Sequence, residues 1–186
     1  MRTIAILASA LLLSVSLSAN DQAKKKEISK ADYERAENLV DVLYQTDPGI
    51  KNFLDKSYAY AIYPKIQKGA VIVGGAGGSG LVYKKKLLGY ALCGYSELEQ
   101  ATIGLQLGGQ SFTEIVFFEN EDAFKALKKG KFELSGQMSA VALKKGAASS
   151  AVYKNGVAIF TFAQKGLMGE LSVGGQKLTY EHAEKK

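Results

Sequence analysis

The chain of 186 residues contains no tryptophan, two prolines, one cysteine and one histidine. Cys93 has no partner within the chain for a disulfide, and we expect it to be a small buried hydrophobe in the apolar segment "GYALCGY". Zinc sites built from cysteine and histidine are excluded by number. His182 lies in the terminal "YEHAEKK", outside the expected fold. We therefore do not expect it to act as the general base for a serine or cysteine nucleophile. We therefore expect no enzyme, no catalytic residues, no metal site and no cofactor.

Arginine is absent after Arg35, although the formal net charge is +6. The lysines form short runs at residues 24–26, 84–86, 128–129 and 144–145. Such runs are typical of solvated turns, and they could also form a patch that attracts anionic lipid or nucleic acid. None of the runs lies on a recognisable reading helix, so we expect no nucleic-acid partner.

Long apolar runs are also lacking, apart from residues 4–17. This run follows Arg2 and leads to small residues that end at Ala19, a pattern typical of a secretory signal peptide at residues 1–19. It is too short for a good transmembrane helix. We expect an exported protein, periplasmic or secreted, that is soluble or peripherally attached to a membrane. Its organisation would be a polar linker at 20–28, one domain at 29–182 and a polar tail at 183–186.

The remaining sequence predicts few helices and many strands. A helix begins near Ser29, and Asp47 followed by Pro48 predicts a second helix to about Lys56. Asn120 caps an expected helix that ends at Gly130. Strand-like runs are expected at 58–64, 70–75, 80–84, 87–93, 102–107, 112–118, 131–143, 149–153, 157–163, 169–173 and 177–180, with a hairpin turn at Asn155-Gly156. This pattern indicates an α+β domain with a largely antiparallel, strongly curved, barrel-like sheet, short N-terminal helices and one inserted helix.

Glycine is abundant, and "VIVGGAGGSGLVY" (71–83) contains the spacing G-x-G-x-x-G in Gly75, Gly77 and Gly80. A dinucleotide site requires a helix directly after such glycines, whereas "LVYKKKLLGYAL" predicts another strand. We therefore expect no nucleotide partner. The glycines can instead let a strand bend, or leave space for a backbone, a ring or a ligand. Several nearby tyrosines could occupy that space: Tyr58, Tyr60, Tyr63, Tyr83, Tyr90 and Tyr95. Alternatively, the glycines form a smooth surface for lipid.

Four segments resemble the SYLF domain family of lipid-binding modules. They are "AIYPKIQKG" (61–69), "GGAGGSGLVY" (74–83), "LEQATIGLQLGGQSFTEIVFFEN" (98–120) and "AVYKNGVAIFTFAQKGLMGELSVGGQKLTYE" (151–181). Their order and spacing resemble the family over about residues 30–181, in its short bacterial exported form. The resemblance implies binding to phospholipid membranes.

Two hypotheses follow from the charge pattern and this resemblance. In the first, an exported domain binds anionic phospholipid headgroups peripherally through lysines beside the glycine-rich segment. The lysines expected to take part are Lys65, Lys68, Lys84, Lys85 and Lys86. In the second, a structural or interaction module binds a protein of the cell envelope through exposed strand edges and tyrosines. A third hypothesis, an enzyme using carboxylates alone, predicts a deep pocket that holds at least two acidic groups, and a structure that places Glu97, Glu114 and Glu170 apart on the surface would dismiss it.

Overall fold

The computed structural model describes residues 30–68, 73–103, 110–130, 132–134, 139–163, 171–172 and 175–183. The predicted signal peptide and linker lie outside these ranges, as does Glu170.

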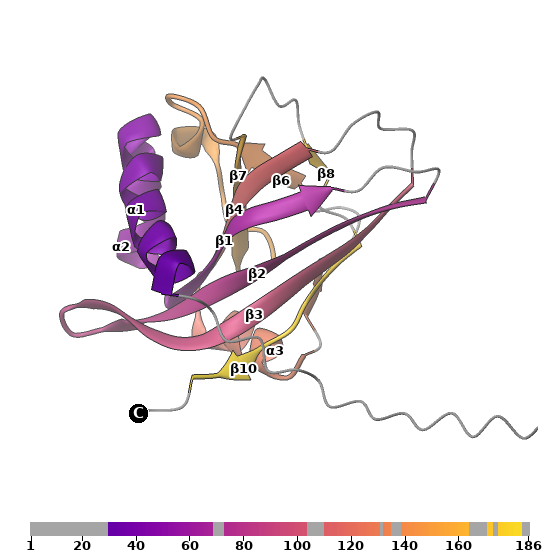
Figure 1. Ribbon diagram of the computed structural model, residues 1–186. Coiled ribbons are helices and arrows are strands. Elements are labelled where there is room, and N and C mark those ends of the chain that lie inside the picture. Colours follow the sequence, from indigo (N-terminus) through magenta and orange to yellow (C-terminus); the bar gives the residue numbers. More distant parts are fainter. Residues whose placement is uncertain are drawn as a thin grey trace, which may run out of the picture.

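Within these ranges, three α-helices and two short 3₁₀ helices flank a large sheet (Figure 1). They are α1 (Lys30–Thr46), η1 (Pro48–Ile50), α2 (Lys51–Lys56), α3 (Glu121–Lys128) and η2 (Ala148–Ser150). The caps predicted at Asp47 and Asn120 are confirmed, because the Asp47 carboxylate accepts the Gly49 N–H at 3.0 Å and the Asn120 side chain accepts the Ala123 N–H at 3.0 Å, whereas Ser29 lies outside the described residues. Gly130 closes α3 with φ of +62°, a left-handed conformation that glycine adopts readily.

One sheet runs through the order β5-β9-β3-β2-β1-β4-β7-β6-β8, and β10 also pairs with β3. Its strands are β1 (Ala59–Lys68), β2 (Val73–Lys86), β3 (Gly89–Ile103), β4 (Gln110–Phe118), β5 (Phe132–Leu134), β6 (Ser139–Ala142), β7 (Val157–Ala163), β8 (Leu171–Ser172), β9 (Gln176–Leu178) and β10 (Glu181–His182). Among the described strands, only β6 and β7 pair in parallel. The predicted α+β class with a strongly curved, largely antiparallel sheet is confirmed.

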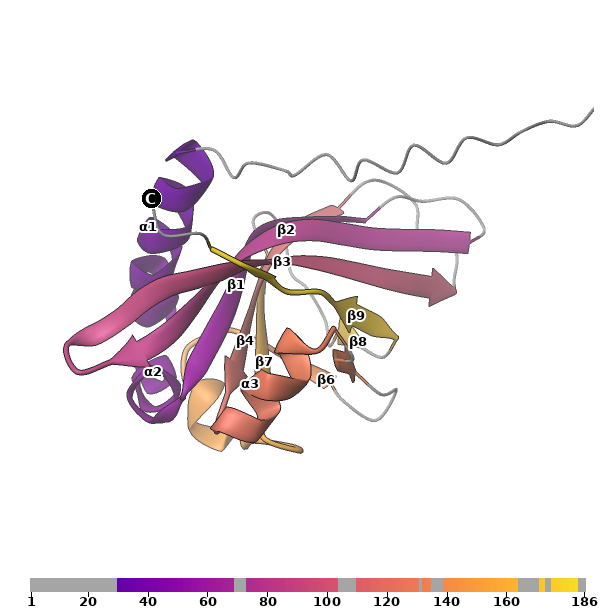
Figure 2. The same cartoon turned by 90° about the horizontal axis from the view of Figure 1, so that it is seen from below.

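Each face of the sheet carries its own hydrophobic core, because side chains alternate between the faces along each strand. The inner core packs β1, β4 and β7 residues such as Tyr63 and Phe118 against Phe124 of α3. The outer core packs the alternate residues, such as Tyr60 and Phe117, against α1 and α2. Figure 2 shows α1 and α2 on one side of the sheet and α3 on another.

Pro64 lies inside β1 and is buried, so the prediction that this strand stops at Pro64 is wrong. The register of β1 shifts between Ile62 and Gln67 against β2, and between Tyr63 and Ile66 against β4. Proline cannot donate a hydrogen bond to a neighbouring strand, and these irregularities accommodate it within the sheet.

Several predicted strand limits are also wrong. The described part of the run predicted at 70–75, which begins at Val73, and the run predicted at 80–84 belong to one strand, β2. Residues 94–101 likewise extend the run predicted at 87–93 into that predicted from residue 102, within β3. The strand predicted at 149–153 is absent, because η2 covers its first two residues and no strand follows up to Tyr153. The buried carboxylate of Asp47 accepts the Ala148 N–H at 2.7 Å, and this contact between distant segments holds η2 in place.

The C-terminal segment is part of the fold, contrary to the expectation for His182. Its strand β10 pairs His182 with Gly94 of β3. The hydroxyl of Tyr180 donates to the carbonyl of Cys93 at 2.8 Å, and the Ala183 N–H donates to the same carbonyl at 3.1 Å. Cys93 is half-buried against the inner core, and this burial raises the pKa of its thiol.

Candidate functional site

The β2–β3 hairpin ends in a turn formed by Leu87 and Leu88, between the paired residues Lys86 and Gly89. The two leucines are 98% and 94% exposed, more than any other large hydrophobic residue that the structure describes. In Figures 1 and 2 the hairpin reaches beyond the neighbouring strands. Turns favour glycine, asparagine and aspartate, so turn formation does not explain a leucine pair here. The sequence predicts a strand at 87–93 that includes both leucines, and this prediction is wrong for Leu87 and Leu88.

Three lysines precede the leucine pair. The Nζ of Lys84 lies 4.7 Å from the ring centre of Tyr58, whose hydroxyl hydrogen-bonds to it and raises the pKa of Lys84. The Nζ of Lys85 donates to the backbone carbonyl of Asp55. Lys86 is exposed at the tip. Lys84 and Lys85 are therefore held against the body of the protein, whereas Lys86 stands beside the exposed leucines.

Tyrosines fix the base of the hairpin. The hydroxyl of Tyr90 donates to the carbonyls of Leu54 at 2.6 Å and of Ser57 at 2.8 Å. The ring of Tyr60 stacks on Tyr83 at 5.0 Å and meets Tyr90 edge-on at 4.8 Å. Burial raises the pKa of all three tyrosines above the ordinary value of 10.0, because it disfavours the charged tyrosinate. These contacts join the hairpin to α2, and they give the exposed tip a fixed base.

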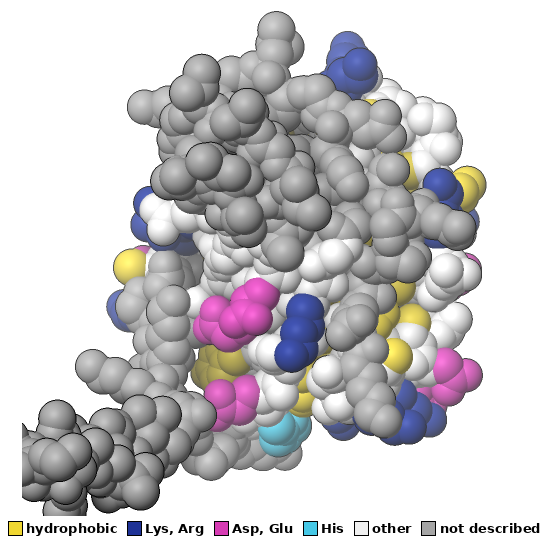
Figure 3. All heavy atoms as spheres, turned by 90° about the vertical axis from the view of Figure 1, so that its right-hand side faces the viewer, with side chains coloured by type: hydrophobic (Ala, Val, Ile, Leu, Met, Phe, Trp, Pro, Cys, Tyr) yellow, Lys and Arg dark blue, Asp and Glu magenta, His cyan; other side chains and the backbone are white. Residues whose placement is uncertain are grey.

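The five candidate lysines form two groups rather than one patch. Lys84 is paired with Ala59 at the start of β1, whereas Lys68 is paired with Ala76 near the other end. At about 3.3 Å per residue, the length of β1 between Ala59 and Lys68 is about 30 Å. Lys65 is exposed on the same distant half of β1. The face of the molecule away from the tip shows basic and acidic side chains interspersed (Figure 3).

Two glycines of β2 are required by close packing. A Cβ at Gly80 would lie 2.5 Å from the Tyr63 ring and 2.9 Å from the carbonyl oxygen of Ile62. A Cβ at Gly78 would lie 2.6 Å from the carbonyl oxygen of Lys65. Real Cβ atoms do not approach other atoms so closely, so both positions exclude side chains. The interpretation that bare positions admit a ring or a backbone is confirmed here.

The other two glycines of the spacing are not crowded. A Cβ at Gly75 or Gly77 would have its nearest neighbour at 3.6 Å or 3.4 Å, which is ordinary contact. All three glycines of the G-x-G-x-x-G spacing lie within β2, which turns directly into β3. The strand–turn–helix arrangement of a dinucleotide site is therefore not formed.

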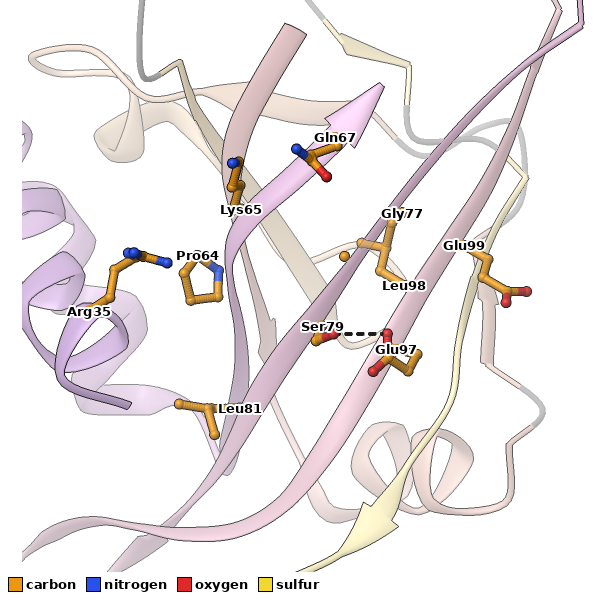
Figure 4. A pocket seen from close by; sticks show the side chains of 11 residues that line it. Arg35, Pro64, Lys65, Gln67, Gly77, Ser79, Leu81, Glu97, Leu98 and Glu99 are labelled. Carbon is orange, nitrogen blue, oxygen red and sulfur yellow. Dashed lines mark hydrogen bonds between the residues drawn. The ribbon is translucent and has the colours of Figure 1, made fainter. Parts of the chain in front are cut away.

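A pocket of about 440 Å³ lies between the N-terminal part of α1, at Arg35, and the glycine-rich part of β2 (Figure 4). Its polar side chains come from four elements: Arg35 of α1, Lys65 and Gln67 of β1, Ser79 of β2, and Glu97 and Glu99 of β3. The hydroxyl of Ser79 donates to Glu97 at 3.1 Å. The sequence predicts Lys65 beside the glycine-rich segment, but it does not predict the other polar residues of the pocket, which converge only in the folded sheet.

Of the three carboxylates considered for catalysis, Glu97 and Glu114 do not converge, and Glu170 lies outside the described residues. Glu114 is completely buried and faces the inner core, because Phe112 and Val116 on either side of it pack there. The amide of Gln176 donates to Glu114 at 3.1 Å. Glu97 is exposed and lines the pocket on the opposite face of the sheet.

The described residues hold no cluster of three or more metal-ligating side chains. No helix among them has the length and hydropathy needed to cross a bilayer.

Comparisons with known proteins point to one family. Residues 99–186 match the family model Ysc84, described as Las17-binding protein actin regulator. The chain is 26% identical over 135 residues to beta cell expansion factor A of Aeromonas veronii, and the match covers 73% of this chain and 50% of that protein. The chain therefore spans about half the length of the curated relative that it matches.

Proposed function

Because the chain belongs to the SYLF family, which the Ysc84 model represents, we propose that it binds the surface of anionic phospholipid membranes and is not an enzyme. Membership of this family suggests a binding domain related to lipid or actin. The chemistry of the exposed hairpin tip favours lipid. We extend the proposal to an exported protein, periplasmic or secreted, that attaches to the membrane peripherally.

The observation that carries the proposal is the adjacency of Leu87 and Leu88 to Lys84, Lys85 and Lys86 on one projecting hairpin. Each lysine near an anionic surface contributes about 1 kcal/mol, and this attraction weakens with salt. Complete burial of a leucine contributes about 1.5–3 kcal/mol. Charge and insertion therefore contribute similar amounts, and neither suffices alone for stable attachment.

Vesicle cosedimentation tests the electrostatic half of this proposal. The protein is expected to bind vesicles of phosphatidylcholine with phosphatidylglycerol, and to bind less at high salt. The Lys84→Ala, Lys85→Ala and Lys86→Ala triple variant should lose about 3 kcal/mol, on the order of a hundredfold in affinity. The single variant Lys86→Ala removes neither the Tyr58 contact nor the Asp55 contact, and it should lose about fivefold.

The matched control is Lys177→Ala. Lys177 is an exposed strand lysine paired with Glu99, toward the end of β3 farthest from the tip. The Lys177→Ala variant should bind vesicles as tightly as the unmodified protein does. Equal binding by the triple variant, at low and high salt, would contradict the proposal. Indifference to vesicle composition together with a specific copurifying protein would favour the envelope interaction module instead.

A further inference from the structure

The pocket over β2 lies apart from the hairpin tip. Its floor includes Gly77 and Gly78, near the middle of β2, whereas the tip follows Lys86 at the end of that strand. Because the sheet order is β3-β2-β1, the pocket has β3 on one side of this floor and β1 on the other. It is an open feature of the outer face, distinct from the surface proposed above to meet the bilayer.

The two sides of the pocket carry opposite charges. Arg35 and Lys65 line it from α1 and β1, and Glu97 and Glu99 line it from β3 (Figure 4). Neighbouring strands lie about 4.8 Å apart, so β1 and β3 are separated by about 9.6 Å across β2. A separation of this size suits a short molecule with an anionic group at one end and a cationic group at the other.

We propose that this pocket binds a zwitterion of the phosphoethanolamine type, with its phosphate toward Arg35 and Lys65 and its ammonium toward Glu97 and Glu99. Guanidinium and ammonium groups are the usual protein partners of phosphate. A primary ammonium donates three hydrogen bonds, which the two carboxylates and the Ser79 hydroxyl can accept. The source of the zwitterion is either the headgroup of phosphatidylethanolamine or the free molecule.

The lining also predicts selectivity between headgroups. Quaternary ammonium groups such as choline donate no hydrogen bonds and are recognised by aromatic cages. The described residues that line the pocket include no aromatic side chain. Phosphoethanolamine should therefore bind at least tenfold more tightly than phosphocholine.

The glycine at position 77 offers a direct way to block the pocket. A Cβ there would meet only an ordinary contact at 3.4 Å, and Gly77 lines the pocket, so we expect Gly77→Val to fill the site. Gly75 lies on the same face of β2, has a similar environment and does not line the pocket, so Gly75→Val is the matched control.

The experiment is titration of the full chain with phosphoethanolamine, phosphocholine and inorganic phosphate. Binding is measured by calorimetry and by the chemical shifts of backbone amides. Phosphoethanolamine should bind most tightly and shift the amides of Ser79 and Glu97. Gly77→Val should weaken its binding at least tenfold, as should the Glu97→Gln, Glu99→Gln double variant, and Gly75→Val should not. Equal binding of all three ligands, or equal effects of the two valine variants, would overturn the proposal.

A vesicle arm separates the two sources, at constant phosphatidylglycerol content. If the headgroup is the ligand, replacing phosphatidylcholine by phosphatidylethanolamine will strengthen vesicle binding. Gly77→Val will then remove only this added affinity and leave the remaining vesicle binding intact. If the free zwitterion is the ligand, Gly77→Val will abolish phosphoethanolamine binding and leave vesicle binding unchanged. Titration with the soluble ligand does not depend on the hairpin, so failure of membrane attachment leaves this test intact.

Discussion

The ring of Tyr63 covers Gly80 so closely that a Cβ at position 80 would lie 2.5 Å from its Cδ1 atom. The hydroxyl of the same tyrosine hydrogen-bonds to Ser96 of β3 at 2.6 Å. One buried side chain of β1 therefore crosses β2 at a bare position and reaches the next strand. This crossing explains a glycine whose place in the sequence resembles a phosphate-binding motif.

Replacing Gly80 by alanine should destabilise the protein by about 1–3 kcal/mol, because Tyr63 or the backbone of Ile62 must move. Gly77→Ala is the matched control. Its Cβ meets only ordinary contacts, and loss of glycine flexibility should leave stability unchanged or raise it by about 0.5–1 kcal/mol. Urea unfolding, monitored by circular dichroism, measures the free energy of unfolding of both variants. Equal stability of the two variants would contradict the packing role of Gly80.

Asp47 should matter more to stability than an exposed aspartate. Its buried carboxylate accepts the backbone N–H groups of Gly49 and Ala148, at 3.0 Å and 2.7 Å. Asp47→Ala leaves both donors without this acceptor and should cost about 2–3 kcal/mol of unfolding free energy. Asp55→Ala removes only an exposed ion pair with Lys51 and should cost at most about 0.5 kcal/mol. A loss for Asp47→Ala as small as that for Asp55→Ala would refute the anchoring of η2.

Stability should fall steeply in alkali. Burial raises the pKa of Tyr60, Tyr63, Tyr83 and Tyr90 above the ordinary value of 10.0, because it disfavours the charged tyrosinate. In the folded state these groups keep their protons above pH 10.0, where the unfolded chain loses them. Their contribution is thus complete below that pH and is lost as the pH rises, by up to about 1.4 kcal/mol per pH unit for each tyrosine.

Urea unfolding at increasing pH, combined with tyrosinate absorbance, checks this expectation. The free energy of unfolding should be level below about pH 9 and should decline above pH 10.0. Tyr63→Phe removes one titrating group and should make the alkaline decline shallower. Full ionisation of all ten tyrosines in a protein that keeps its native circular dichroism would disprove the link between buried tyrosines and alkaline unfolding.

Local signals predicted the parts of the fold that depend on neighbouring residues. The Asn155-Gly156 turn is confirmed, with φ of +53° and +76° and paired hydrogen bonds between Lys154 and Val157. The helices that begin after Asp47 and Asn120 were predicted for the same reason, since the capping bond of each side chain lies within the first turn of the helix that follows it. Alternation along "SFTEIVFF" also places Glu114 on the face of Phe112 and Val116, although its burial was not inferred.

Features made by distant segments could not be predicted in this way. In the run "KKKLLGYAL" the lysines are the residues typical of a solvated turn, so the pattern gives no sign that Leu87 and Leu88 form it. The pocket brings together Arg35, Lys65 and Glu97, which are 30 or more positions apart and meet only through the sheet order. Separation of the lysines into two groups likewise depends on the antiparallel register of β1 and β2.

Membrane attachment through the hairpin tip is tested most directly by tryptophan fluorescence, because the chain contains no tryptophan of its own. In Leu88→Trp the new side chain replaces a residue that is 94% exposed in the free protein. Its emission should shift to shorter wavelength on vesicles that contain phosphatidylglycerol, and quenchers within the acyl region should reach it. The control Asn38→Trp, on the exposed face of α1, should show no shift. A blue shift for Asn38→Trp but none for Leu88→Trp would show that another surface meets the lipid.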